Sequence, residues 1–170
     1  MAVTDNLFNK RKIAVLGSRS VGKIAKPLPH PSFYLTSCLS NTLGKSSLVI
    51  QFVENVFNPH YFPTIENTFT KQIKYKGREF ECDIIDTSGQ DEYSQLNSRH
   101  SVGVHGYILV YSVANRTSFD MVRTVHDKII TQSGMATIPC VVVGQKSDLA
   151  DSRYVSHSLC LPCCFIRFGS

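Results

Sequence analysis

Two Gly-Lys pairs near the N-terminus have the residue types of a phosphate-binding loop. The first pair, Gly22 and Lys23, completes a spacing of glycine, four residues and Gly-Lys that starts at Gly17. Such a loop directs backbone N–H groups, here those of Ser20 and Val21, at phosphate oxygens, and its lysine reaches the terminal phosphates. The pattern requires Ser or Thr next, where the hydroxyl binds magnesium, but residue 24 is isoleucine.

The hydroxyl that the first pair lacks follows the second pair, in the run Gly44, Lys45, Ser46 and Ser47. Removing residues 24–45 joins the flanking sequences into GSRSVGKSSLVIQF, which is one complete phosphate-binding loop. We interpret residues 24–45 as an insertion within that loop; a genuine loop of this protein is the alternative. Because the helix that starts at the serines must begin beside the phosphates, we expect Lys45 to bind them and Lys23 to be secondary.

Three side chains with oxygen atoms can bind the Mg²⁺ ion that accompanies a nucleoside triphosphate. The hydroxyls of Ser46 and Thr64 can each take one coordination position. Asp86 ends an apolar strand pattern, and its carboxylate can hold the same ion through water. We expect these three residues to form the metal site.

The sequence DTSGQDEYS places two residues where they can act on a terminal phosphate. Gly89 has no side chain, so its backbone N–H can approach the third phosphate closely. Gln90 can orient a water molecule for in-line attack, which is a positioning role and not covalent chemistry. Gln90 is therefore the catalytic candidate.

The sequence VGQKSD follows another apolar strand pattern and has the residue types that bind a purine base. The carboxylate of Asp148 can accept hydrogen bonds from N1–H and the amino group of guanine, whereas adenine presents an acceptor at N1. Gln145 and Lys146 precede it and complete this candidate base loop. The expected ligands are therefore GTP and GDP.

Alternating strand and helix patterns predict an α/β fold with a mostly parallel sheet and flanking helices. Strands are expected over residues 12–17, 68–75, 78–86, 106–113 and 138–144, with a tight turn at 76–77. The continuous apolar runs at 106–113 and 138–144 are typical of central parallel strands. Helices are expected over residues 46–57, with serines at the start, and 117–132, where Thr117 and Asp120 have a capping-box spacing.

Composition and charge indicate a globular protein. The 170-residue chain has 42% hydrophobic and 18% charged residues. Its net charge is +5, but Lys and Arg are scattered and only residues 10–12 form a basic run, so we expect no nucleic-acid partner. No apolar run approaches the ~20 residues of a membrane span, and the N-terminus has no apolar signal region. A cytoplasmic location is therefore expected.

The cysteines divide into two groups. Cys82 and Cys140 lie within apolar strand patterns, which favours small buried side chains. Cys160 and Cys163 have the spacing of a metal or redox pair, but no second pair accompanies them. We interpret residues 1–156 as one domain, interrupted at about 24–45, and residues 157–170 as an unrelated disordered tail.

Taken in order, these motifs resemble the Ras superfamily of small GTPases. SRSVGK, SSLVIQFVE, PTIENTFTK, DTSGQDEYS and GYILVYSV resemble its Rheb branch, and the similarity covers residues 10–23 and 46–156. It implies the small G-protein (P-loop NTPase) fold and a switch that binds GTP or GDP and hydrolyses GTP with Mg²⁺. It also implies a GTPase-activating protein as a partner and a role upstream of a TOR-type kinase complex. Arg19 matches the Rheb-type loop, which implies slow intrinsic hydrolysis.

The chain departs from that family at several positions. Gln145 stands where the family has asparagine, and Phe62 stands where aspartate is common. After SRYVS the family continues with a helix, a sixth strand, a guanine-binding loop and a last helix, none of which is predicted here. The fold is therefore expected to be incomplete at its C-terminal end. No C-a-a-X box ends the chain, so no lipid anchor is expected.

Two other functions remain open at this point. A binding-only protein would keep the effector sequences PTIENTF and DEYS but would not hold nucleotide tightly. A phosphate-transferring kinase is disfavoured by the base loop at 145–148 and by the lack of a lid motif for a second substrate. Tight nucleotide binding would distinguish the GTPase from the first alternative, and competition by GTP but not ATP from the second.

Overall fold

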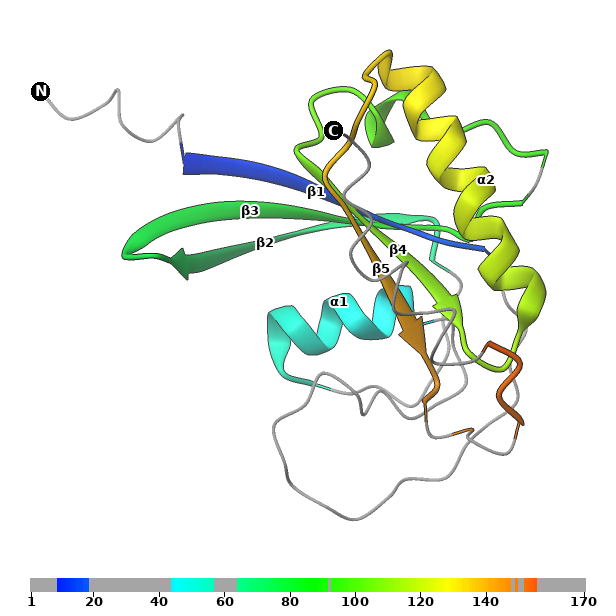
Figure 1. Ribbon diagram of the computed structural model, residues 1–170. Helices are drawn as coiled ribbons and strands as arrows, with labels where there is room; N and C mark the ends of the chain where they lie inside the picture. The colour runs from blue at the N-terminus through cyan, green and yellow to red at the C-terminus, as the bar shows by residue number, and fades with distance from the viewer. Residues whose placement is uncertain are drawn as a thin grey trace, which may run out of the picture.

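The computed structural model describes residues 9–18, 44–56, 64–91, 93–147, 149 and 152–155. Most of the predicted insertion (24–43) and the predicted tail (157–170) lie outside these residues. Within them, five strands form one sheet in the order β2-β3-β1-β4-β5 (Figure 1). The predicted α/β fold with a mostly parallel sheet is confirmed.

Three of the four strand pairings are parallel. β1 (Lys10–Leu16) lies between β3 (Arg78–Thr87) and β4 (Gly106–Ser112), and β4 pairs with β5 (Cys140–Gln145). β2 (Glu66–Tyr75) is antiparallel to β3. The prediction that residues 138–144 form a central strand is wrong for the described sheet, because β5 lies at its edge and Val141 is 51% exposed.

The predicted tight turn joins β2 and β3. Lys76 has a φ angle of 49° and Gly77 has a φ angle of 75°. Two successive positive φ angles match the right-handed twist of a hairpin, and glycine adopts this conformation without steric cost. The turn therefore sets the register in which Tyr75 pairs with Arg78.

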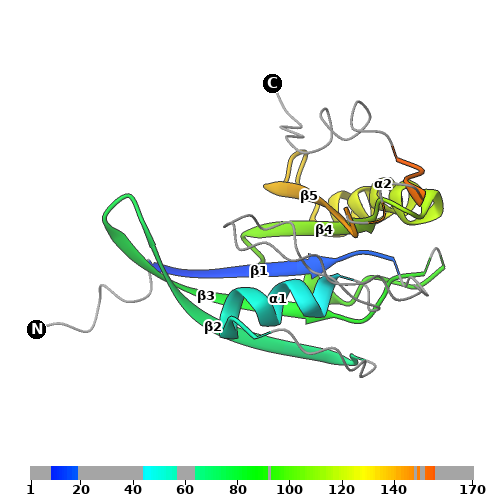
Figure 2. The same ribbon diagram turned by 90° about the horizontal axis from the view of Figure 1, so that it is seen from below.

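Two helices cover opposite faces of the sheet (Figures 1 and 2). α1 (Lys45–Glu54) packs against β2 and β3, and α2 (Arg116–Ser133) packs against β4. The side chains of β1 alternate between the two faces, as the strand period requires. Ala14 and Leu16 belong to the α2-side cluster, which includes Tyr107, Leu109, Tyr111, Val122, Val125 and Ile129. Val15 belongs to the α1-side cluster, which consists of Val15, Val49, Ile84 and Val110.

α2 begins at Arg116, one residue before the predicted capping box. Its N-cap is Asn115, whose side-chain oxygen accepts a hydrogen bond from the N–H of Ser118 at 3.1 Å. The predicted role of Thr117 as the cap is therefore wrong, because asparagine already satisfies this free N–H group. The predicted apolar face is confirmed: Val122, Val125 and Ile129 are buried, and Phe119 packs against them.

α1 also differs from its prediction at both ends. Its N-cap is Gly44, with no side-chain hydrogen bond, so Ser46 lies inside the first turn and is not the cap. The helix ends at Glu54 because Asn55 adopts the left-handed conformation with φ of 56°, which asparagine tolerates. Val56 therefore lies beyond the helix and is exposed.

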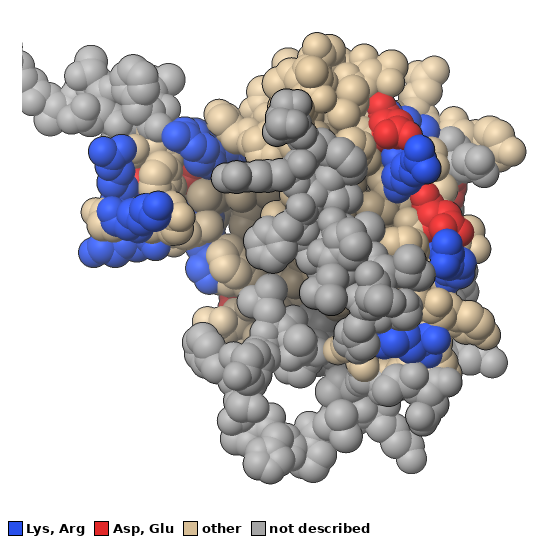
Figure 3. Space-filling view, in the orientation of Figure 1, with Lys and Arg blue, Asp and Glu red and all other residues tan. Residues whose placement is uncertain are grey.

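Basic residues that are far apart in the sequence gather at one end of the sheet. The start of β1 and the end of the β2–β3 hairpin lie together there, and Figure 3 shows their Lys and Arg side chains on one side of the molecule. Residues 10–12 and 71–83 contain seven basic and three acidic residues. The fold therefore brings together basic residues that are scattered in the sequence, while other Lys and Arg side chains lie on the opposite side of the molecule. Among the described residues, no helix is long and apolar enough to span a membrane.

Candidate functional site

The predicted site residues converge at the carboxyl ends of β1, β3, β4 and β5. Gly17 follows β1 and lies directly against the neighbouring strand. A Cβ atom at this position would come within 2.2 Å of the carbonyl oxygen of Val110. Only glycine permits this approach, so the chain leaves β1 close to the backbone of β4.

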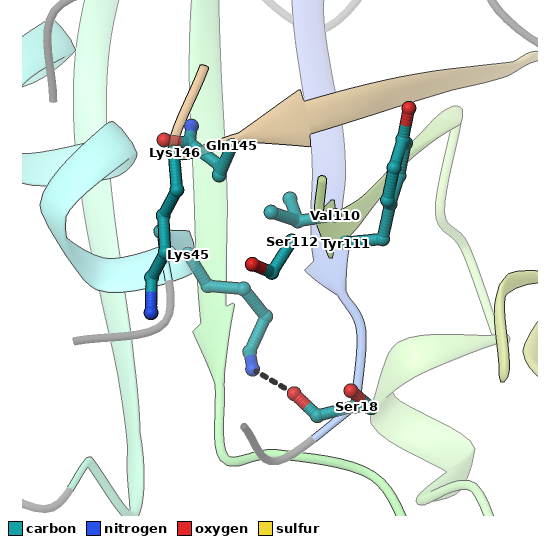
Figure 4. A pocket seen from close by; sticks show the side chains of 8 residues that line it. Ser18, Lys45, Val110, Tyr111, Ser112, Gln145 and Lys146 are labelled. Carbon is teal, nitrogen blue, oxygen red and sulfur yellow. Dashed lines mark hydrogen bonds between the residues drawn. The ribbon is translucent and has the colours of Figure 1, made fainter. Parts of the chain in front are cut away.

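Lys45 is buried at the first turn of α1 and is 3% exposed. Its Nζ donates hydrogen bonds to the carbonyl oxygen of Ser18, at 3.3 Å (Figure 4), and to that of Gly17, at 3.4 Å. Lys45 thus lies beside Gly17 and Ser18, where the first loop pattern starts, although residues 19–43 separate them in sequence. This is the position expected for a phosphate-binding lysine. Lys23 lies outside the described residues, so the choice between the two lysines stays a prediction.

The candidate phosphate loop and the candidate base loop meet at Gly44. A Cβ atom on Gly44 would lie 2.2 Å from Cγ of Gln145, so the backbone approaches that side chain closely. A small pocket lies between the loops, and the residues that line it are Ser18, Gly44, Lys45, Val110, Tyr111, Ser112, Gln145 and Lys146 (Figure 4). Lys146 has a left-handed backbone with φ of 64°. The side chain of Gln145 is longer than that of the asparagine expected at this position, and it fits here because Gly44 has no side chain.

The three expected metal ligands lie near one another. The hydroxyls of Ser46 and Thr64 are 2.8 Å apart and share a hydrogen bond. Asp86 is 1% exposed, and its Oδ1 has no hydrogen-bond partner. Burial raises the pKa of the Asp86 carboxyl, while a hydrogen bond from Ser46 and the charge of Lys45 act in the opposite direction. An unpaired buried carboxylate oxygen beside two hydroxyls fits the oxygen ligands that Mg²⁺ prefers.

Gln90 is docked on the candidate phosphate loop, but its side chain is engaged elsewhere. Its backbone N–H donates to the carbonyl oxygen of Gly17 at 2.9 Å. The side chain is buried, and its Oε1 accepts a hydrogen bond from Ser94 Oγ at 3.3 Å. Gly89 precedes it and is half-buried. The described arrangement therefore brings Gln90 to the site while the amide that would orient water is bonded to Ser94.

Several predicted residues cannot be placed. The described part of the chain does not include Ser20, Val21, Gly22, Lys23 and Asp148. The predicted backbone cradle for phosphate and the predicted guanine carboxylate therefore stay predictions.

Two supporting residues were not predicted. Thr87 is buried and its Oγ1 donates to the carbonyl oxygen of Val15 at 2.8 Å, which fixes the end of β3 to β1 beside Asp86. Thr87 could have been predicted from the sequence as a supporting residue, because it directly follows Asp86. Lys128 binds the carbonyl oxygen of Ser94 at 2.8 Å from helix α2. No local pattern marks Lys128, because its partner is 34 residues away.

Comparisons with known proteins agree with this geometry. The Ras family model matches residues 40–161. The chain is 54% identical to the GTP-binding protein rhb1 of Schizosaccharomyces pombe over 149 residues, which cover 88% of this chain and 69% of that protein. It is 52% identical to the small monomeric GTPase RhbA of Aspergillus fumigatus, with 86% and 67% covered. It is 44% identical to the GTP-binding protein Rheb of Homo sapiens, with 86% and 68% covered. The chain therefore belongs to the Ras family and is a Rheb-like small GTPase.

Proposed function

We propose that this chain binds GTP or GDP together with Mg²⁺ at the carboxyl ends of β1, β3 and β5 and hydrolyses GTP as a signalling switch. One observation carries the proposal. Lys45 is buried against the carbonyl oxygens of Gly17 and Ser18, and Asp86 keeps an unpaired buried oxygen. A buried carboxylate oxygen without a hydrogen-bond partner is costly, and a bound cation would compensate that cost.

The chain's own residues would divide the work as follows. Lys45 binds the terminal phosphates, and the first turn of α1 contributes the positive end of its dipole. Ser46 and Thr64 would bind Mg²⁺ directly, with Asp86 holding it through water. When bound, the ion supplies neutralisation of charge on the terminal phosphates. Binding would require the hydroxyls of Ser46 and Thr64 to exchange their mutual hydrogen bond for the ion.

Base recognition is proposed for the loop that follows β5. Gln145 packs on Gly44 and Lys146 lines the same pocket, so the base would lie next to the phosphate loop. Asp148 would select guanine by accepting hydrogen bonds that adenine cannot donate. Asp148→Asn should therefore weaken GDP binding and relax the discrimination against adenine nucleotides.

Hydrolysis requires a change at Gln90. To orient water, its amide must leave the hydrogen bond from Ser94 and become accessible. Because Gln90 is buried in the described arrangement, a protein that binds nucleotide but hydrolyses it slowly or not at all is the second candidate. Single-turnover hydrolysis of bound GTP distinguishes the two functions.

Partners and location follow as further proposals. Ile65 and Tyr93, in the segments that resemble the effector sequences, are 89% and 93% exposed, which suits contact with another protein. We propose a GTPase-activating protein and a TOR-type kinase complex as partners, and a cytoplasmic location. Fractionation of cells that express the tagged chain tests the location. Membrane association that resists high salt would contradict it, whereas the basic end of the sheet permits only salt-sensitive attraction.

The proposed function is tested by titrating the purified chain with fluorescent GDP in Mg²⁺. We expect Lys45→Ala to reduce affinity by roughly 100-fold or more, since a charge-assisted phosphate contact is lost, and Lys23→Ala to have a smaller effect. GTP should compete with the probe and ATP should not. A larger loss at Lys23 would reverse the assignment of the two lysines. No binding by the unmodified chain would contradict the proposal.

The role of the insertion is tested with a second variant. Deleting residues 24–45 restores one continuous phosphate loop, and we expect it to improve nucleotide affinity by orders of magnitude. Equal affinity of the two chains would mean that residues 24–45 form a loop compatible with binding. Thermal unfolding of both chains without nucleotide controls for a general change in stability.

A further inference from the structure

The basic end of the sheet, which consists of the start of β1 and the β2–β3 hairpin, lies far from the candidate nucleotide site. β1 starts at Lys10 and leads to Gly17 at the site, and β3 runs parallel to it from Arg78 to Asp86 and Thr87. The extended residues 10–17 span about 23 Å. A ligand at the basic end would therefore leave the nucleotide site free.

The charges at the basic end are only partly compensated by nearby carboxylates. Lys10 Nζ forms ion pairs with Glu81 at 3.0 Å and with Asp83 at 3.1 Å. Lys76 and Arg78 are both exposed and, among the described residues, neither forms an ion pair. The turn therefore carries positive charge that faces solvent (Figure 3).

Aromatic side chains accompany these cations. Tyr75 is 61% exposed and pairs with Arg78 across the hairpin. Lys76 Nζ lies 5.4 Å from the centre of the Tyr75 ring, and the Arg11 guanidinium lies 5.4 Å from the centre of the Phe80 ring. Tyrosine is enriched where a membrane meets water, and basic side chains are attracted there by anionic lipids. This combination of residue types suits the surface of an anionic bilayer.

The shape of the hairpin distinguishes a bilayer from an acidic protein segment. The turn extends beyond the nearest end of α1 in both ribbon views (Figures 1 and 2). A Cβ atom on Gly77 would meet no atom within 4 Å, so the turn is open to its surroundings. A projecting turn can contact a flat surface without rearrangement, but it does not enclose an extended peptide. The geometry therefore favours a bilayer.

We propose that the basic end of the sheet docks reversibly on anionic lipid bilayers, with Tyr75 at the level of the headgroups and Lys76 and Arg78 beside them. In this orientation the carboxyl ends of β1 and β3 point away from the membrane, so the nucleotide site stays accessible. Each basic residue near the surface contributes about fivefold in affinity. The attraction falls off within a Debye length, which is about 10 Å at 0.1 M salt and about 3 Å at 1 M.

The electrostatic part is tested by sedimenting the full chain with vesicles of phosphatidylcholine that contain roughly 30% phosphatidylserine, at about 0.1 M salt. The double variant Lys76→Gln, Arg78→Gln should bind about 20-fold more weakly. The double variant Arg116→Gln, Arg123→Gln is the matched control, because it removes the same charge from exposed positions on α2. It should keep most of the affinity. Equal losses in the two double variants would overturn the proposal, as would binding that persists at about 1 M salt.

The orientation is tested with a single fluorescent probe, since the chain contains no tryptophan. Tyr75→Trp places the probe on the hairpin, and Tyr154→Trp, at a residue that is 70% exposed after β5, is the matched control. Phosphatidylserine vesicles should shift the emission of Tyr75→Trp to shorter wavelength and leave that of Tyr154→Trp unchanged. No shift for Tyr75→Trp, or equal shifts for both variants, would overturn the proposed orientation.

An acidic protein segment is the alternative partner, and soluble polyglutamate is the probe for it. At equal total charge, polyglutamate should bind the chain more weakly than phosphatidylserine vesicles do. Equal or tighter binding of polyglutamate would overturn the proposal in favour of a protein partner. None of these measurements requires a nucleotide, so their failure and the failure of the proposed function are separate results.

Discussion

Helices α1 and α2 cover opposite faces of the same sheet, but they are held there differently. α2 has an asparagine cap and buries apolar side chains along its length, including Val122, Val125 and Ile129. α1 has a glycine cap without a side-chain bond, and Val49 is its one buried apolar residue. Its other buried residue is Lys45, whose ammonium is bonded to loop carbonyls.

The two helices therefore differ in role: α2 supports the sheet, whereas α1 carries predicted site residues. The helix that carries Lys45 and Ser46 packs on the sheet through few apolar side chains, and its first turn makes polar contacts where a charged ligand would bind. The helix that bears no predicted site residue is attached by packing. Elements that bind ligands are commonly among the less stable parts of a protein, because binding supplies part of the free energy that orders them.

The largest expected effect concerns packing beneath α2. Ile129→Ala removes a fully buried side chain, and we expect the free energy of unfolding to fall by about 3 kcal/mol, because the lost transfer free energy adds to the cost of a cavity. Phe52→Ala in α1 should cost less than about 1 kcal/mol, since Phe52 is 41% exposed. Urea unfolding of both variants measures the contrast. Equal losses would show that the two helices are held to similar extents.

The next effect uses a thiol as a probe of the α2 side. Cys140 packs against the α2-side cluster, and burial raises its pKa to about 11 from 9.0. A raised pKa lowers the thiolate fraction at pH 8, so alkylation by iodoacetamide should be about 100-fold slower than in the urea-unfolded chain. The rate should rise about tenfold per pH unit up to the raised pKa. Peptide mass spectrometry follows this cysteine separately from the others, and equal rates in the two states would contradict its protection.

A smaller effect is expected at the single buried apolar residue of α1. Val49→Ala should lower the free energy of unfolding by about 1.5 kcal/mol, which is the transfer free energy of two methyl-sized groups. If nucleotide binding orders α1, saturating GDP should restore more stability to this variant than to Ile129→Ala. Thermal unfolding with and without GDP measures the difference. Equal GDP-induced shifts of the unfolding temperature in the two variants would contradict an ordering of α1 by the ligand.

The smallest effect tests the cap of α2. Asn115→Ala should cost about 1 kcal/mol, because the N–H of Ser118 loses its side-chain acceptor. Thr117→Ala, at the position that the sequence pattern favoured, should change stability by less than about 0.5 kcal/mol. A reversed order of the two variants in urea unfolding would place the cap at Thr117 after all.

Local patterns in the sequence were sufficient to predict the helices and strands, although not every end of each one. The alternation in residues 78–86 and the Lys76-Gly77 turn predicted the hairpin, since both depend on neighbouring residues only. Two apolar runs end at Gly17 and Asp86, and these runs predicted that both residues lie at the carboxyl ends of strands, where the site forms. Because parallel strands end at one edge of a sheet, the convergence of Gly17, Asp86 and Gln145 could also be predicted.

Contacts between distant residues were decided by the tertiary structure. The unpaired oxygen of Asp86, the burial of Gln90 and the bond from Lys128 to Ser94 depend on how separate elements pack. The edge position of β5 and the basic end of the sheet depend on strand order. A sequence specifies residue types and local periodicity. Whether a polar group is left unpaired depends on which protein atoms replace the water around it, and those atoms come from distant parts of the chain.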